Sequence, residues 1–306
     1  MLREGSWWRH RGAGGCLCCA SQRLETQPTL TSLFLSRVAW QGRPELTSIH
    51  RCVDCDFRFY DRGLSDDEAA AFYAAYRTDD YLAQRHADEP FYTRRVHAEI
   101  ERFLHSPARR ESLARVLERG GVATPVGSVL DYGGGDGRLI SALHANRRAV
   151  FDIGGETAVL AGIEAVSAEQ LREEWDLVVC AQTLEHVTDP LATVQRLLAL
   201  TRPGGSMYLE VPNEIWKNAT FPGRMRDALL RLAARSRRLF IAADVYSTGF
   251  RIKTGVLPPF GFMPMREHLN YFTPRALDAL VRRAGGEVMF ADFDSLGGIV
   301  AVARRR

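Results

Sequence analysis

The carboxyl-terminal half of the chain alternates short apolar runs with helical or Gly/Pro-rich segments. Each apolar run is long enough for one strand, and they occupy residues 129–132, 149–153, 177–181, 207–211, 288–290 and 299–303. Alternation of this kind predicts a mainly parallel sheet with helices on both faces. We therefore expect an α/β fold from about residue 126 onwards.

Capping residues mark several helix starts. Ser65 and Glu68 have the spacing of a capping box, in which the hydroxyl and the carboxylate each satisfy a free backbone N–H. Aromatic residues recur after it, and we expect residues 63–125 to form a helical linker or lid. Two further starts place a capping side chain before a proline at the first helical position, at Asp189-Pro190 and Thr273-Pro274.

Residues 213–265 break the alternation and are interpreted as an insertion over the carboxyl ends of the strands. Within it, residues 224–241 form a basic amphipathic segment. Such a segment is typical of a solvated helix face on a substrate lid. The alternative is contact with a membrane surface or with a diphosphate-linked substrate, because basic amphipathic helices suit both.

Composition and charge narrow the class of protein. The chain has 306 residues, of which 46% are hydrophobic and 25% charged, as in an ordinary globular protein. No apolar run approaches the length of a membrane span, and no apolar stretch of a signal peptide follows the basic start, so we expect a cytoplasmic protein. A net charge of +3 is too small to indicate nucleic acid as a partner.

A glycine-rich loop follows the first predicted strand. Asp131 precedes a run in which Gly133, Gly134, Gly135 and Gly137 leave the backbone N–H groups bare, and a helix is expected from about Arg138. Arg138 occupies the place of the third glycine of a dinucleotide fingerprint, and no phosphate-binding Lys-Ser/Thr pair follows. The loop therefore departs from both nucleotide patterns.

Asp152 ends the next predicted strand, where a carboxylate can accept both hydroxyls of a ribose. This position favours a ligand that contains adenosine. The alternative is that Asp152 only caps a turn before Gly154 and Gly155.

Cysteines cluster near the amino terminus. Cys16 and Cys19 form one C-x-x-C knuckle and Cys52 and Cys55 form another, and four such thiolates can surround one tetrahedral zinc ion. The intervening segment is expected to form a hairpin or a helix of its own. Cys18 leaves the choice of ligand ambiguous, and a redox dithiol or unrelated free cysteines are the alternatives. We expect a zinc-binding module over residues 1–62.

Residues 126–306 resemble the class I S-adenosylmethionine-dependent methyltransferases. The resemblance rests on the glycine loop, on Asp152 and on the order of three further segments, Trp175-Asp176-Leu177-Val178-Val179-Cys180 running to Leu184-Glu185-His186-Val187, Arg202-Pro203-Gly204-Gly205, and His268-Leu269-Asn270-Tyr271-Phe272-Thr273. It implies a Rossmann-like, mostly parallel sheet of seven strands whose final strand is antiparallel.

The same resemblance implies how the cofactor, S-adenosylmethionine, is held. Asp131 and the glycines would bind its methionine part, Asp152 its ribose, and residues near Ser167 its adenine. Gln182 is also expected among the cofactor-binding residues. The stretch 154–174 departs most from the family, because its strand is short.

The cysteine knuckles followed by the aromatic helix resemble a narrower group, the sugar and natural-product methyltransferases with an N-terminal zinc-binding domain. In that group the zinc is structural. The expected acceptor is therefore a small molecule, with a sugar or a surface-polysaccharide precursor as the favoured class.

Methylation of a hydroxyl or a carbon acid needs a base, and histidine is the usual one. His268 is the first choice, with Tyr271 as orienter or acid, and His186 is the second candidate. Glu185 with His186 could instead bind a divalent ion. Two other functions stay open: an RNA methyltransferase whose zinc module grips RNA, and a cofactor-binding scaffold without catalysis.

Overall fold

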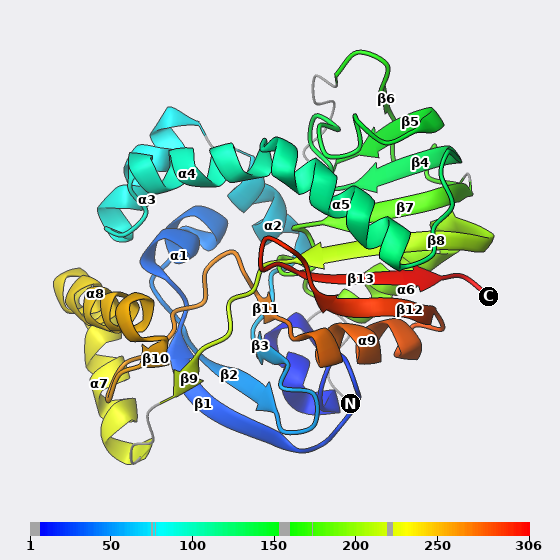
Figure 1. Ribbon diagram of the computed structural model, residues 1–306. Helices are drawn as coiled ribbons and strands as arrows, with labels where there is room; N and C mark the ends of the chain where they lie inside the picture. The colour runs from blue at the N-terminus through cyan, green and yellow to red at the C-terminus, as the bar shows by residue number, and fades with distance from the viewer. Residues whose placement is uncertain (1–6, 75, 77, 153–159, 173, 219–222) are drawn as a thin grey trace.

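The computed structural model describes residues 7–74, 76, 78–152, 160–172, 174–218 and 223–306. A seven-stranded sheet with helices on both faces fills one end of the molecule, and a smaller antiparallel sheet with further helices lies beside the ends of its strands (Figure 1). None of the helices in these ranges is long and apolar enough to cross a membrane.

The large sheet has the order β12-β13-β8-β7-β4-β5-β6. The pairs from β8 to β6 are all parallel, whereas β13 runs antiparallel to both of its neighbours. The prediction of a Rossmann-like sheet with an antiparallel final strand is therefore confirmed. The strands are β4 (Val126–Tyr132), β5 (Ala145–Phe151), β6 (Glu164–Ala165), β7 (Trp175–Ala181), β8 (Thr201–Val211), β12 (Glu287–Phe293) and β13 (Ile299–Arg304).

Alternating side chains of β7 show how the sheet is covered. Leu177 and Val179 pack with α5 (Pro107–Arg119) on one face. Val178 and Cys180 pack with α6 (Pro190–Leu200) and α9 (Pro274–Arg283) on the other. Each such residue, when fully buried, contributes about 1.5–3 kcal/mol for a Val- or Leu-sized side chain. Both predicted Pro-led starts are present, because Asp189 and Thr273 cap α6 and α9 with their side chains.

The prediction of a helix from about Arg138 is wrong. Residues 138–143 form successive turns, in which Ile140, Ser141 and Leu143 each donate a backbone N–H to the carbonyl three residues earlier. Because β5 already begins at Ala145, the segment is too short to settle into regular four-residue hydrogen bonding.

The amino-terminal sheet has the order β1-β2-β3-β11 and is antiparallel throughout. Its fourth strand comes from far downstream, so the sheet crosses the expected boundary at residue 62. The segment between the cysteine knuckles forms a strand, a helix and a strand, which agrees with the expected local structure. The elements are the 3-10 turns η1 (Trp7–Arg9) and η2 (Arg11–Gly14), then β1 (Leu24–Leu30), α1 (Leu33–Trp40), β2 (Leu46–Cys52), β3 (Arg58–Tyr60) and β11 (Asn270–Tyr271).

The described residues within 63–125 are mainly helical, and the role of this stretch as a linker or lid stays a prediction. The capping box is present, since the Ser65 side chain accepts from the Glu68 N–H and the Glu68 side chain accepts from the Ser65 N–H. Before α5 the helices are α2 (Asp66–Tyr73), α3 (Asp79–Asp88) and α4 (Arg94–Leu104).

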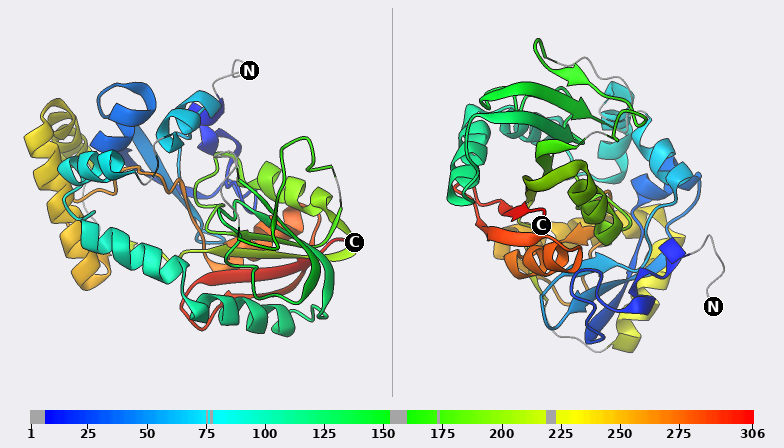
Figure 2. Two further views of the ribbon diagram at one scale, coloured as in Figure 1. Left: turned by 90° about the horizontal axis from the view of Figure 1, so that it is seen from above. Right: turned by 90° about the vertical axis from the view of Figure 1, so that its right-hand side faces the viewer.

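The insertion contributes two helices that lie against the amino-terminal sheet. Leu30 of β1 packs with Leu230, Phe240 and Phe262. Figure 1 and the left view of Figure 2 place these helices at the end of the molecule farthest from the large sheet. The elements are β9 (Lys217–Asn218), α7 (Gly223–Arg235), α8 (Arg237–Thr254) and β10 (Val256–Leu257).

Candidate active site

The glycine loop begins directly after β4. Gly133, Gly135 and Gly137 have φ angles of +78°, +56° and +77°, in the left-handed region that favours glycine. A Cβ atom on Gly134 would lie 2.2 Å from Cγ of Asp131. The loop therefore needs glycine for its conformation and for its close approach to the carboxylate.

Asp131 places a buried carboxylate directly before the glycine loop. It is 1% exposed, and neither carboxylate oxygen has a hydrogen-bond partner among the described residues. Burial raises its pKa to about 7, although the charge of Arg109 opposes this shift. A cationic ligand group beside Asp131 would relieve the cost of burying it. The site thus fits S-adenosylmethionine, which carries an ammonium and a sulfonium.

The other expected cofactor residues lie at neighbouring strand ends. Asp152 follows β5, and its Oδ2 accepts the Gly135 N–H at 3.1 Å. Gln182 follows β7 and donates from Nε2 to Glu210 at 3.0 Å. Ser167 is exposed just after β6. Gly154 and Gly155, which the alternative explanation of Asp152 invokes, lie outside the described residues.

A buried ion pair that the sequence did not indicate lies next to Gln182. Arg109 of α5 lies 2.9 Å from the Glu210 carboxylate on β8, and the Tyr208 hydroxyl donates to the same carboxylate at 2.9 Å. Glu210 also accepts from Gln182. No sequence signal separates Arg109 from the other arginines of the linker.

The two histidine candidates come together. His186 lies in the loop after β7, and His268 precedes β11; their ring centroids are 4.7 Å apart. His268 donates from Nδ1 to Glu214 at 2.5 Å, and His186 donates from Nδ1 to the Glu267 carbonyl at 3.1 Å. In each ring the bonded Nδ1 leaves Nε2 to face other groups.

The glycine loop and the loop of His186 are in contact, because a Cβ on Gly133 would lie 2.5 Å from Oγ1 of Thr183. Glu214 was missed in the sequence. Its place shortly after β8, at the carboxyl edge of the sheet, is the signal that points to it.

The two histidines differ in their charge. Burial lowers the pKa of His186 to about 3, and the positive charge of His268 adds to this effect. Burial also opposes protonation of His268, but Glu214, Glu267 and Glu185 outweigh it and raise its pKa to about 9. At neutral pH His186 is therefore neutral and His268 is paired as an imidazolium.

Glu185 completes a group of potential metal ligands. Its side chain is 1% exposed, both of its carboxylate oxygens lack a hydrogen-bond partner among the described residues, and burial raises its pKa to about 7. One ligand atom each from Glu185, His186 and His268 lies within 4.8 Å of the others. The sequence indicates Glu185 and His186 as possible ligands of a divalent ion, and the fold places His268 beside them.

The tyrosine that lies against His186 is Tyr73 and not the expected Tyr271. The Tyr271 hydroxyl lies 3.4 Å from that of Tyr60, in the apolar cluster beside Trp216. The Tyr73 ring of α2 instead stands edge-on to His186, with 6.2 Å between centroids. The Tyr73 hydroxyl is buried without a hydrogen-bond partner in the described part of the chain.

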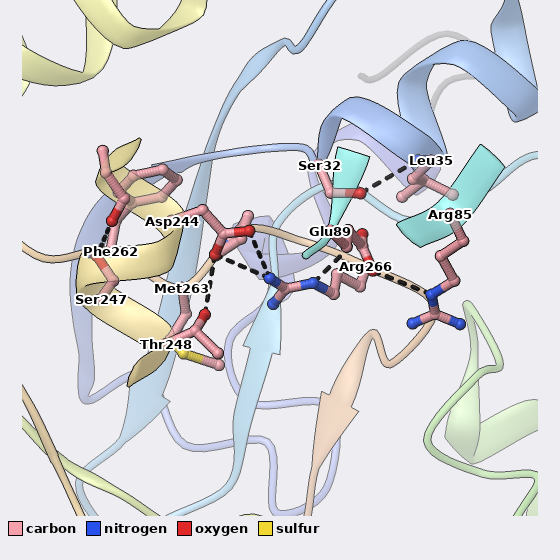
Figure 3. Close-up of polar contacts among 12 residues, drawn as sticks. Ser32, Leu35, Arg85, Glu89, Asp244, Ser247, Thr248, Phe262, Met263 and Arg266 are labelled. Carbon is pink, nitrogen blue, oxygen red and sulfur yellow. Dashed lines mark hydrogen bonds and ion pairs between the residues drawn. The ribbon is translucent and has the colours of Figure 1, made fainter. Parts of the chain in front are cut away.

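Salt bridges connect α3 and α8 to the segment that precedes His268 (Figure 3). Arg266 lies 2.7 Å from Asp244 on α8 and 3.3 Å from Glu89, the residue after α3. Arg85 of α3 reaches both Glu89 and Glu267. Arg266 and Glu267, the two residues before His268, are thus held by elements far apart in the sequence.

The four cysteines of the two knuckles converge. Sγ of Cys16 lies 3.6 Å from Sγ of Cys55, and Sγ of Cys19 lies 3.5 Å from Sγ of Cys52, with all four within 4.8 Å. Tetrahedral zinc with Zn–S bonds of about 2.3 Å needs thiolates about 3.8 Å apart. Cys18 is not among the four thiols that converge, and the choice of these four as zinc ligands stays a prediction.

Comparison with known proteins agrees with this geometry. Residues 91–289 match the family model described as "Methyltransferase domain". The ubiquinone biosynthesis O-methyltransferase of Pseudomonas paraeruginosa is 30% identical over 176 residues, which cover 47% of this chain and 75% of the relative. That of Xanthomonas campestris is 34% identical over 110 residues, covering 30% and 46%.

Solved structures give more distant similarities. A methyltransferase dependent on S-adenosylmethionine from Aquifex aeolicus is 15% identical with a TM-score of 0.41, covering 68% of this chain and 98% of its own. Human N-acetylserotonin methyltransferase, solved with S-adenosylmethionine, is 15% identical with a TM-score of 0.42, covering 76% and 58%. The strand order, the glycine loop and the family match together show that this chain belongs to the class I S-adenosylmethionine-dependent methyltransferases.

Proposed function

We propose that this enzyme methylates a hydroxyl group of a small-molecule acceptor, with His268 and Glu214 as the catalytic dyad. The observation that carries the proposal is the short Nδ1 contact of His268 with Glu214, beside the loop that follows β7. The relatives named as O-methyltransferases support an oxygen nucleophile. A sugar or surface-polysaccharide precursor is the acceptor class that we favour.

The bound cofactor would supply an electrophilic methyl group for in-line displacement, so positioning accounts for much of the rate. Asp131 and the glycine loop would bind its methionine part, Asp152 its ribose, and the region of Ser167 its adenine. In its neutral form, His268 would take the hydroxyl proton on Nε2 as the acceptor oxygen attacks, while Glu214 keeps the proton on Nδ1 and stabilises the resulting imidazolium.

We also propose a structural zinc ion held by Cys16, Cys19, Cys52 and Cys55. The spacing of the four sulfurs supports it, and so does their position in the main apolar cluster, next to Phe57. Four protein ligands leave no open position, which is typical of a structural rather than a catalytic zinc site. The ion would fix the amino-terminal sheet against α9 and the large sheet.

The test is methyl transfer from tritiated S-adenosylmethionine to three panels: nucleotide sugars, small phenols and catechols, and total RNA. We expect product on a small hydroxyl acceptor and a loss of at least about 10²-fold in kcat for His268→Gln. Cofactor binding by calorimetry should be unchanged in that variant.

Three results would overturn the proposal in different ways. Transfer to RNA alone would support the RNA methyltransferase instead. Tight cofactor binding without transfer to any panel would support the non-catalytic scaffold. Full turnover by His268→Gln would remove the dyad and leave the methyltransferase assignment intact.

A further inference from the structure

Arg11 is a buried cation whose side chain bonds three separate parts of the chain. It is 4% exposed. Nε donates to the Thr188 carbonyl at 2.8 Å, Nη1 to the Tyr60 carbonyl at 2.9 Å, and Nη2 to Oδ1 of Asn270 at 2.6 Å. Burial lowers its pKa to about 9, so the side chain is charged at neutral pH and its bonds are charge-assisted. The guanidinium therefore links η2 to β3, to β11 and to the loop after β7.

Asn270 extends this link into the loop that carries His186. Its Nδ2 donates to the Leu184 carbonyl at 2.8 Å and to the Val187 carbonyl at 2.7 Å. An arginine only donates and a carbonyl only accepts, so the amide of Asn270 has one orientation, in which Oδ1 faces Arg11. Arg11 thus fixes the amide that holds the loop on both sides of His186.

The same strand places the second histidine. His268 lies two residues before Asn270, and the backbone N–H groups of Leu269 and Asn270 donate to the Glu185 carbonyl at 2.6 and 3.1 Å. The ring centroids of His186 and His268 are 4.7 Å apart. A shift of either segment by about 1 Å would change this separation, and misplacement of that size can cost about 10²-fold in rate.

We propose that Arg11 is a positioning residue of the methyl-transfer reaction, which acts through Asn270 to set the placement of His186 and His268. The hydrogen bonds of Arg11 go to backbone carbonyls and to Asn270, and not to either ring. The residue belongs to η2, just before the first cysteine knuckle, so the amino-terminal segment takes part in the geometry of the site. The effect on the rate rests on the proposed function, whereas the placement of the rings can be observed without turnover.

Arg62 offers a matched control, because it is a second buried arginine of the amino-terminal segment and is 3% exposed. Its guanidinium binds Glu45 at 3.0 Å, Glu68 at 2.8 Å and the Gly63 carbonyl at 2.7 Å. Within the described residues, these hydrogen bonds reach neither the loop of residues 184–188 nor β11. A loss of stability is therefore common to Arg62→Met and Arg11→Met, and a loss of the loop contact is specific to Arg11→Met.

The test uses the full chain, well below its unfolding midpoint. Proton–carbon NMR spectra report the two histidine rings, whose signals are assigned with His186→Gln and His268→Gln. In Arg11→Met we expect both ring signals to move and kcat to fall at least about tenfold on the acceptor panel that gives product. The Kd for S-adenosylmethionine should stay within about twofold, because the proposed cofactor residues follow β4 and β5. Arg62→Met should leave the ring signals and kcat in place.

A double-variant cycle tests whether Arg11 acts through Asn270. If it does, Arg11→Met combined with Asn270→Ala should lose no more kcat, and move the ring signals no further, than Asn270→Ala alone. Additive losses in the double variant would contradict the link.

Unchanged ring signals in Arg11→Met, or the same movement in Arg62→Met, overturns the proposal. If Arg11→Met fails to fold, Arg11→Lys replaces it. Lysine keeps the charge but lacks the planar fork that joins three acceptors, so both ring signals should still move, and unchanged signals would again overturn the proposal. Full turnover by His268→Gln together with moved signals in Arg11→Met would contradict the proposed base and still support the placement of the rings by Arg11.

Discussion

His268 and Glu214 lie in hydrogen-bond contact although they flank opposite ends of the insertion, with 2.5 Å between Nδ1 and Oε2. The intervening chain leaves the large sheet after β8, builds α7 and α8, and returns to β11. The proposed dyad therefore joins the segment that follows β8 to the segment that precedes β11.

The pH dependence of the rate tests this dyad. A base with a pKa of about 9 is mostly protonated at neutral pH, so we expect kcat/KM to rise with pH up to about 9. Glu214→Gln removes the strongest charge that favours the imidazolium, so the ascending limb should move to lower pH and the plateau should fall. A limb that stays in place in Glu214→Gln would mean that another group titrates.

The same pair makes stability depend on pH. The pKa of His268 is raised from an unfolded value near 6.5 to about 9, so its contribution is complete below pH 6.5 and is lost as pH rises through 9. Between pH 7.5 and 9 the unaltered chain should lose about 2 kcal/mol of unfolding free energy through this residue. Urea unfolding at both pH values measures it.

The control for that measurement is His268→Gln, which should flatten the dependence in this window. Asp131 and Glu185 have raised pKa values of about 7, so their contributions change mainly at lower pH and do not confuse the comparison. An equally steep loss in His268→Gln would contradict the assignment.

Gly134→Ala tests the close approach of the loop to Asp131. The new Cβ would lie 2.2 Å from Cγ of Asp131, so loop and carboxylate must separate. We expect the Kd for S-adenosylmethionine to rise at least tenfold by calorimetry, about 1.4 kcal/mol. Gly14→Ala, whose Cβ would meet no atom within 4 Å, is the matched control and should bind normally.

Removal of metal tests the cysteine site. We expect one zinc per chain by mass spectrometry, and chelation or Cys55→Ser should lower the unfolding midpoint, since a structural site contributes directly to folding. Cys18→Ala is the control because Cys18 lies outside the four converging thiols, and it should retain the metal. Retention of full stability after the metal has been removed would exclude a structural role.

The role of the basic face formed by α7 and the start of α8 is still open between a solvated lid and a membrane contact. Leu229, Leu232 and Leu239 are 42%, 51% and 46% exposed among arginines. If the alternative of membrane contact holds, the chain should float with vesicles that contain anionic lipid, and the triple change of Arg231, Arg235 and Arg238 to Glu should abolish flotation. Flotation that persists in the triple variant, or none in the unaltered chain, leaves the solvated lid.

The parts of the fold with local signals could be predicted from the sequence. Strand periodicity, the glycine loop, the capping residues and the cysteine knuckles each act over a few positions, and the sheet, the helix starts and the converging thiols agree with them. Residues 138–143 are predicted as the start of a helix but form turns, because the segment before β5 is too short for a regular helix.

Contacts across long sequence distances could not be predicted in this way. The partners Arg109–Glu210, Arg85–Glu267 and His268–Glu214 are selected by tertiary packing. The roles expected of His186, His268 and Tyr271 stay predictions, and the placement of the Tyr271 hydroxyl beside Tyr60 favours the histidines as the reactive groups.

The pairing of β3 with β11 has a consequence for biosynthesis. Because Asn270 and Tyr271 supply the last strand of the amino-terminal sheet, a nascent chain cannot finish that sheet until these two residues have left the ribosome. Fragments cut between the two expected domains would each lack a strand or its partner. The cysteine-rich unit and the catalytic unit should therefore be expressed, and should evolve, as one inseparable piece.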